Sequence, residues 1–118
     1  MKALSIHQPW ASLIIHGPKR IENRSWPTPH RGTLLIHATR RQYQGEDVPG
    51  LPRPMVYGSL LGTVDLVDCV PLKYVADRPF AEGPWCWLLE NPRPLKTSIP
   101  YRGRQQLWNV PDEFVRVQ

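Results

Sequence analysis

Charged side chains that could act together crowd the stretch GPKRIENRSW, residues 17–26. Lys19 and Arg24 can supply fixed positive charge for a phosphate or a developing oxyanion, and Glu22 can act as a general base or orient a lysine. The same side chains on a solvent-facing strand would form surface ion pairs, which contribute little to stability. The stretch therefore predicts either an anion-binding cleft or an exposed charged strand.

Two features of the surrounding residues favour the cleft. A glycine and a proline end a preceding helix just before Lys19, and the partial negative charge at a helix C-terminus favours cations. Alternation along an expected strand at 20–26 places Arg20, Glu22, Arg24 and Trp26 on one face. Because an aromatic ring beside arginines can stack on a nucleobase, we expect these charged ends to reach one cavity.

One early helix must position this stretch. Residues 2–6 predict a short strand, and residues 9–16 predict a helix with proline in its first turn and glycine just past its end. Trp10, Leu13 and Ile14 fall on one face of that helix at helical spacing. We expect that face to lie in the core, with Trp10 close enough to the charged stretch to border the cleft.

Short strands and proline-rich connections fill the rest of the chain. The stretch 39–58 contains prolines and glycines that forbid a long helix, so it predicts a long ordered loop. This pattern favours a mainly β (α+β) fold in a single domain over residues 1–118. The expected architecture is a small closed barrel with one N-terminal helix and short peripheral helical turns. Further strands are expected at 33–38, 59–72, 84–90, 95–101 and 106–110.

The charge balance suits a polyanionic partner. The chain carries 15 basic and 10 acidic residues, a formal charge of +5, and 11 of its basic residues are arginines. Arginine pairs with phosphate in a fork geometry and stacks on bases, which favours nucleic acid. Genomic base composition or heat adaptation would produce the same balance.

A second basic cluster lies in residues 92–108. Basic and aromatic residues are interleaved there, as in grooves that bind single-stranded nucleic acid; they are Arg93, Lys96, Arg102 and Arg104 with Tyr101 and Trp108. Arg40 and Arg41 lie in the long loop and could widen such a surface. Arginines that protect an exposed strand edge from aggregation would show the same pattern.

Other classes of function find less support. The four histidines lack the spacing of a metal site, and no Walker or dinucleotide glycine pattern occurs, so we expect no metal and no cofactor. Cys69 and Cys86 lie in apolar surroundings without a C-x-x-C pair, which predicts buried reduced thiols. With no apolar run of membrane-spanning length, we expect a soluble, cytoplasmic protein with no membrane partner.

Several blocks in order resemble one family. ALSIHQPWA, GPKRIENRSW, RGTLLIHA, GTVDLVDCV, WLLENPRPL and LWNVP together are similar to the activating-signal-cointegrator homology (ASCH) domain, with its G-x-K-x-x-E-x-R motif. The resemblance covers nearly the whole chain. It implies a PUA-like β-barrel whose motif residues line a cleft for RNA or a nucleotide. Gly17, Lys19, Glu22 and Arg24 occupy the motif positions.

The resemblance also implies an enzymatic alternative. Some members are described as hydrolases of acylated cytidine nucleosides and others as ribonucleases. Where the amidohydrolases have a threonine three residues beyond the lysine, this chain has Glu22, so a Glu22-activated water beside Lys19 is the hydrolytic version that fits.

We therefore expect a module that binds RNA or a nucleotide-like ligand. The alternatives are a small hydrolase, amidohydrolase or ribonuclease, with Lys19 and Glu22 as catalytic residues, and a protein interaction module without a nucleic-acid partner. The candidate binding residues are Lys19, Glu22, Arg24, Trp26, Trp10, Arg40, Arg41, Arg102 and Arg104.

Overall fold

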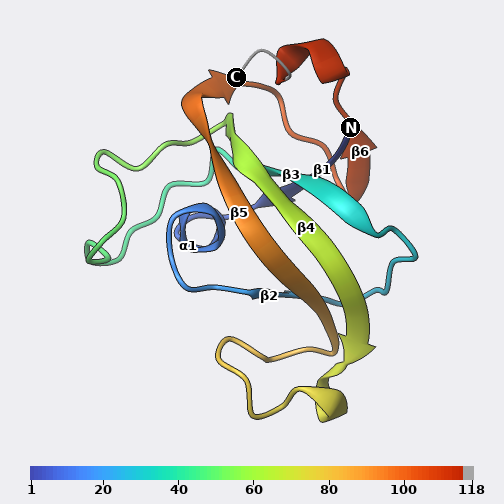
Figure 1. The fold of residues 1–118 in the computed structure, drawn as a ribbon. Helices are drawn as coiled ribbons and strands as arrows, with labels where there is room; N and C mark the ends of the chain where they lie inside the picture. Colours follow the sequence, from blue (N-terminus) through green and yellow to red (C-terminus); the bar gives the residue numbers. More distant parts are fainter. Residues whose placement is uncertain (116–118) are drawn as a thin grey trace.

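The protein is a mainly β structure built around one strongly curled sheet (Figure 1). The computed structural model describes residues 1–115. Six strands follow the order β2-β5-β4-β3-β1-β6, with β1 and β3 parallel and the other neighbours antiparallel. The strands are β1 (Lys2–Ile6), β2 (Ile21–Arg24), β3 (Gly32–Ala38), β4 (Ser59–Pro71), β5 (Trp85–Pro100) and β6 (Leu107–Asn109).

The predicted fold class is confirmed, although the sheet forms a half-barrel. Within residues 1–115, β2 and β6 end the sheet and do not pair with each other, so the expected closure is absent. Two short 3₁₀ turns, Leu72–Tyr74 and Asp112–Phe114, are the predicted peripheral helical turns. Among the described residues, no helix is long and apolar enough to span a membrane.

The one α-helix within residues 1–115, α1 (Trp10–Ile15), packs on the sheet against β3, β4 and β5. Its start is fixed by Gln8, which accepts a hydrogen bond from the Ser12 amide at 2.9 Å and donates to the Ser12 hydroxyl at 2.8 Å. Leu13 and Ile14 are buried as predicted. The prediction was wrong for Trp10, which is 47% exposed because the first turn of α1 lies at the rim of the sheet's core.

The two longest strands run side by side along the molecule (Figure 1). β4 was predicted as one strand, but the prediction of two separate strands at 84–90 and 95–101 was wrong, because β5 continues through Pro92 and Pro94. Register shifts between β4 and β5 absorb these irregular residues. Gly62 permits the close approach, since a Cβ atom there would lie 2.5 Å from the Arg93 carbonyl oxygen.

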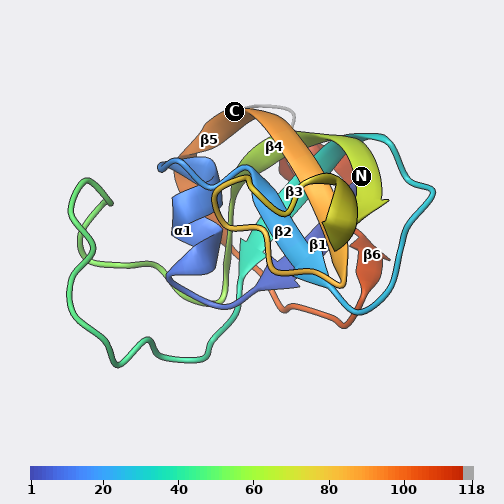
Figure 2. The ribbon, with the colours of Figure 1, turned by 90° about the horizontal axis from the view of Figure 1, so that it is seen from below.

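The remaining segments frame the sheet. Segment 39–58 contains no helix or strand, as predicted, and extends away from the sheet (Figure 2). Cys69 and Cys86 are both free thiols, Cys86 buried and Cys69 partly buried.

The main apolar core joins the buried face of α1 to β1, β3, β4 and β5, with Trp87 as its largest buried side chain. Burying apolar surface contributes about 25 cal/mol of stability per Å². Burial of this face therefore fixes the helix on the sheet and, with it, the start of the segment that follows the helix.

Candidate functional site

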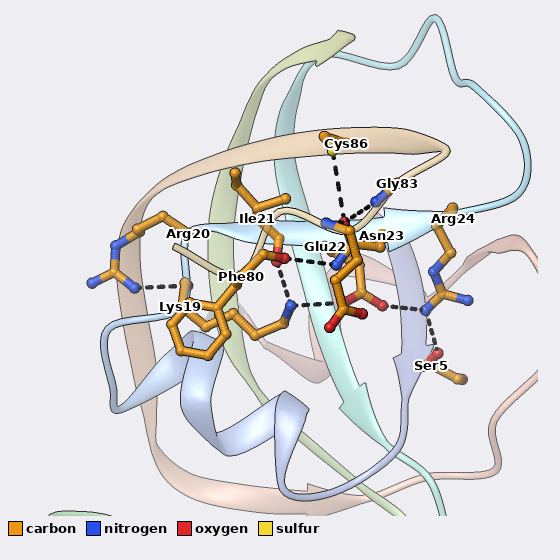
Figure 3. A network of polar contacts seen from close by, with 11 residues as sticks. Ser5, Lys19, Arg20, Ile21, Glu22, Asn23, Arg24, Phe80, Gly83 and Cys86 are labelled. Carbon is orange, nitrogen blue, oxygen red and sulfur yellow. Dashed lines mark hydrogen bonds and ion pairs between the residues drawn. The ribbon is translucent and has the colours of Figure 1, made fainter. Parts of the chain in front are cut away.

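Lys19, Glu22 and Arg24 form one ion-paired triad (Figure 3). The Lys19 Nζ atom lies 3.5 Å from Glu22 Oε1, and Arg24 Nη2 lies 2.9 Å from Glu22 Oε2. Lys19 also donates a hydrogen bond to the Ile21 carbonyl oxygen. The side chains of Lys19 and Glu22 are 4% and 11% exposed, so the triad is largely removed from water. Glu22 is therefore the shared anion of two cations.

The turn between α1 and β2 positions this triad. The Lys19 amide donates to the Leu13 carbonyl at 3.1 Å, which closes the end of the helix. The prediction that Arg20 shares one face with Glu22 and Arg24 was wrong, because Arg20 precedes β2 and turns back to the end of the helix. Its guanidinium donates to the Gly17 carbonyl at 2.9 Å, where the negative end of the helix favours a cation. β2 then pairs with β5, and strand alternation places Glu22 and Arg24 on the same face, as predicted.

A cavity of about 290 Å³ opens beside the triad. The Lys19 Nζ atom lies 5.7 Å from the ring centroid of Trp10 and 5.3 Å from that of Phe80, within cation–π range. We call this cavity the motif cavity; it is lined by Trp10, Lys19, Glu22, Asn23, Phe80 and Glu82.

Asn23, which the sequence did not single out, holds one wall of the motif cavity. Its Oδ1 atom accepts hydrogen bonds from the amides of Glu82 at 2.9 Å and Gly83 at 2.8 Å, and its Nδ2 donates to the Phe80 carbonyl at 2.9 Å. Phe80 has a φ of 68°, a left-handed conformation that is unusual for an aromatic residue. The Asn23 amide thus secures the strained segment that brings Phe80 to Lys19 (Figure 3).

Replacing Asn23 by alanine should release this segment. Three hydrogen bonds are lost at once, and each contributes about 0.5–1.5 kcal/mol, so the free energy of unfolding should fall by roughly 2–3 kcal/mol. The amides of Glu82 and Gly83 should exchange with deuterium faster than in the unaltered protein. Asn109→Ala, at an exposed position of β6, is the control; equal exchange in the two variants would contradict this role of Asn23.

The motif residues do not all face the motif cavity. Arg24 lies beyond Glu22, where its Nη2 donates to the Ser5 carbonyl of β1 at 3.0 Å. Trp26 is absent from the lining; it packs edge-on against Trp87, with ring centroids 4.8 Å apart. One ammonium and two carboxylates line the cavity, so the cavity itself is not predominantly basic.

The arginines of the second cluster meet elsewhere. Arg40 from the long loop and Arg102 and Arg104 from the segment after β5 line one cavity of about 490 Å³. We call this cavity the arginine groove; its other lining residues are Ser5, His37, Thr39, Tyr101, Gly103 and Gln105. Arg41 lines a neighbouring cavity of about 340 Å³ that shares Trp10 with the motif cavity.

The exposed arginines fall into two groups according to their partners. Each arginine of a first group forms an ion pair with an aspartate: Arg31 with Asp68, Arg53 with Asp47 and Arg93 with Asp65. Within residues 1–115, a second group of exposed arginines forms no ion pair; its members are Arg40, Arg41, Arg78, Arg102 and Arg104, and all of these except Arg78 line the arginine groove or its neighbouring cavity. Positive charge is therefore left uncompensated around the arginine groove.

His37 forms the floor of the arginine groove. Its Nε2 atom lies 2.7 Å from the Tyr101 carbonyl oxygen, which can only accept, so Nε2 carries the proton and Nδ1 faces the Ser5 hydroxyl at 3.1 Å. A Cβ at Gly103 would lie 2.6 Å from His37 Cε1, so only glycine fits there. Burial lowers the pKa of His37 from 6.5, and the hydrogen bond to Tyr101 acts in the opposite direction.

This histidine should make stability depend on pH. Below pH 6.5 the unfolded chain protonates His37 before the folded protein does, so the free energy of unfolding should decrease as the pH falls through this range. Urea titrations between pH 7.5 and 5 test this sign. His37→Gln should show a shallower decrease with falling pH, and an unchanged slope in this variant would contradict the role of His37. Burial of His16 acts in the same direction, so part of the slope should remain.

Comparison with known proteins places this fold in a family. The family model described as "ASCH domain" matches residues 4–98. Activating signal cointegrator 1 of Homo sapiens is 35% identical over 126 residues, which cover 91% of this chain. The protein of the same name from Mus musculus is 35% identical over 127 residues. The chain spans 22% of the length of these two relatives.

A solved structure shares the architecture. The crystal structure of ASCH from Zymomonas mobilis aligns with a TM-score of 0.65 at 19% identity, over 95% of this chain and 88% of that chain. At this identity the likeness concerns the fold, a curled sheet with one short helix. Since the family model spans most of the residues, including the motif and both long strands, the chain belongs to the ASCH domain family.

Proposed function

We propose that this ASCH domain binds single-stranded RNA, with the phosphates on the arginine groove and one nucleotide at the motif cavity. The uncompensated charge of Arg40, Arg102 and Arg104 carries the proposal. Arginine guanidinium groups that lack an acidic partner are free to bind phosphate oxygens in the bidentate geometry that phosphate favours.

The two cavities have no lining residue in common, but Arg24 connects them. Ser5 lines the arginine groove, and its carbonyl oxygen accepts a hydrogen bond from Arg24, which in turn pairs with Glu22 at the motif cavity. On another side, the cavity lined by Arg41 and Trp10 adjoins the motif cavity. A strand of a few nucleotides could follow this basic path.

The aromatic residues favour a single strand over a duplex. Trp10 is half-exposed at the motif cavity, and the rings of both Trp10 and Phe80 lie within cation–π range of Lys19. Unpaired bases can stack on such rings, whereas bases within a duplex are already stacked. Base–aromatic stacking contributes about 1–3 kcal/mol per base.

Fluorescence anisotropy with a labelled single-stranded RNA of 12 nucleotides tests the proposal. The affinity should fall steeply with salt, by about 0.7 log units per log unit of salt for each phosphate contacted. A duplex of the same length should bind less tightly. No binding at 50 mM salt, or an affinity that does not change with salt, would overturn the proposal.

The enzymatic and protein-binding alternatives stay predictions. Hydrolysis would use Lys19 and Glu22, whose charged atoms lie 3.5 Å apart at the motif cavity. Turnover of RNA or of an acylated nucleoside by the protein, reduced roughly 10²- to 10⁴-fold in Glu22→Gln, would support a general base there. The relatives named activating signal cointegrator 1 suggest a coactivator role through protein partners, which the exposed loop at 39–58 could serve.

A further inference from the structure

We infer that the motif cavity selects guanine, through Glu22 and Lys19 acting on the Watson–Crick edge of the base. This inference rests on the proposed RNA binding and names the base that enters the cavity. Its basis is the balance of hydrogen-bond donors and acceptors among the side chains that line the motif cavity.

The size and walls of the cavity fit one base. At about 290 Å³ it lies at the lower end of the range for ligand pockets, so it admits a single ring system and excludes a larger portion of the strand. The ring centroids of Trp10 and Phe80 lie 5.7 and 5.3 Å from the Lys19 Nζ atom, so both rings border the ammonium. A flat ring entering here has an aromatic face to stack on and charged groups at its edge.

The Lys19 ammonium has spare donor capacity at the cavity. It has three N–H donors; one binds the Ile21 carbonyl and one faces Glu22 Oε1. One N–H therefore remains for a ligand. The Asn23 amide uses its Oδ1 atom and one of its two Nδ2 donors on the segment of Phe80, Glu82 and Gly83.

The Glu22 carboxylate has spare acceptor capacity. It offers about four lone-pair positions, and its contacts to Lys19 and Arg24 occupy one on each oxygen. Two positions are left, one on each oxygen, and the exposed Glu82 adds a further carboxylate to the lining. Glu22 and Lys19 together therefore match a ligand edge with two adjacent N–H donors and one acceptor.

Guanine alone among the four RNA bases has such an edge. Its N1–H and N2–H₂ groups can donate to the two Glu22 oxygens, and its O6 atom can accept from Lys19. Cytosine and adenine present one amino donor each on this edge, and uracil presents one N–H between two carbonyl oxygens. The fixed position of Glu22 between two cations holds its carboxylate ready for this pairing.

Binding of the five-nucleotide RNAs UUXUU, with X as guanosine, inosine, adenosine, cytidine or uridine, tests the inference at 50 mM salt. Guanosine should bind roughly tenfold more tightly than adenosine, cytidine or uridine, since a bidentate base contact discriminates by about this much or more. Inosine keeps O6 and N1–H but lacks the N2 amino group, so it should bind several-fold less tightly than guanosine. This comparison needs no variant.

Glu22→Gln provides the second arm. It replaces one carboxylate oxygen by an amide nitrogen, so the preference for guanosine over adenosine should shrink to about twofold or less. Glu90→Gln removes the same charge at an exposed position of β5 and should keep the preference. Equal affinity for all five RNAs with a normal salt dependence would overturn the guanine inference and leave the proposed function standing. Absence of binding by every RNA would overturn both.

Discussion

Replacing Arg102 and Arg104 together by alanine is expected to weaken single-stranded RNA binding by about 10- to 100-fold at 0.1 M salt. Both guanidinium groups line the arginine groove and have no ion-pair partner within residues 1–115. If each contacts one phosphate, the slope of log affinity against log salt should decrease by about 1.4. Anisotropy titrations at four salt concentrations measure both quantities.

The matched control removes the same charge from another surface. Arg31→Ala with Arg93→Ala also lowers the net charge by two, but these guanidinium groups pair with Asp68 and Asp65. We expect a much smaller loss of affinity and an almost unchanged salt slope. If the two double variants lose affinity equally, the effect belongs to net charge, and the arginine groove is not the RNA-binding surface.

Replacing Glu22 by alanine is expected to lower the free energy of unfolding by about 3–5 kcal/mol. Lys19 and Arg24 would then lose their shared counter-ion, and the Lys19 side chain, 4% exposed, has little access to water. Loss of one partner from a buried ion pair is costly because the other charge remains desolvated. Urea denaturation at pH 7 measures the change.

Two further variants separate the charge from the shape of the side chain. Glu22→Gln keeps hydrogen-bonding capacity beside both cations, so it should be less destabilising than Glu22→Ala. Glu90→Ala, at an exposed position, should change stability by less than about 0.5 kcal/mol. A loss below about 1 kcal/mol for Glu22→Ala would mean that the triad contributes no more than a surface ion pair.

Features set by neighbours along the chain were predicted correctly. The helix at α1 follows from proline before it, glycine after it and apolar residues at helical spacing. Glu22 and Arg24 share a face because side chains alternate along any strand. The mainly β class likewise follows from the short alternating segments and their turn residues.

Long-range pairing decided what the sequence left open. Proline residues indicated a break between two strands at 91–94. In the structure β5 continues past these prolines because its pairing with β4 contains register shifts. Trp10 had the spacing of a core residue, yet the position of α1 on the sheet leaves it half-exposed at the motif cavity. Trp26 had the spacing of a cleft residue, yet Trp87 holds it beside the core.

The sequence by itself determined which residues carry charge and how Glu22 and Arg24 are oriented relative to each other, because strand geometry repeats every two residues. Only the tertiary structure decided what surrounds them. Asn23 reaches Phe80 across 57 residues, and Arg40 meets Arg102 from a distant segment. Such contacts depend on the order of strands in the sheet and on the close approach of distant backbone segments. Neither produces a repeating pattern in the sequence, so the two cavities could be identified only in the folded protein.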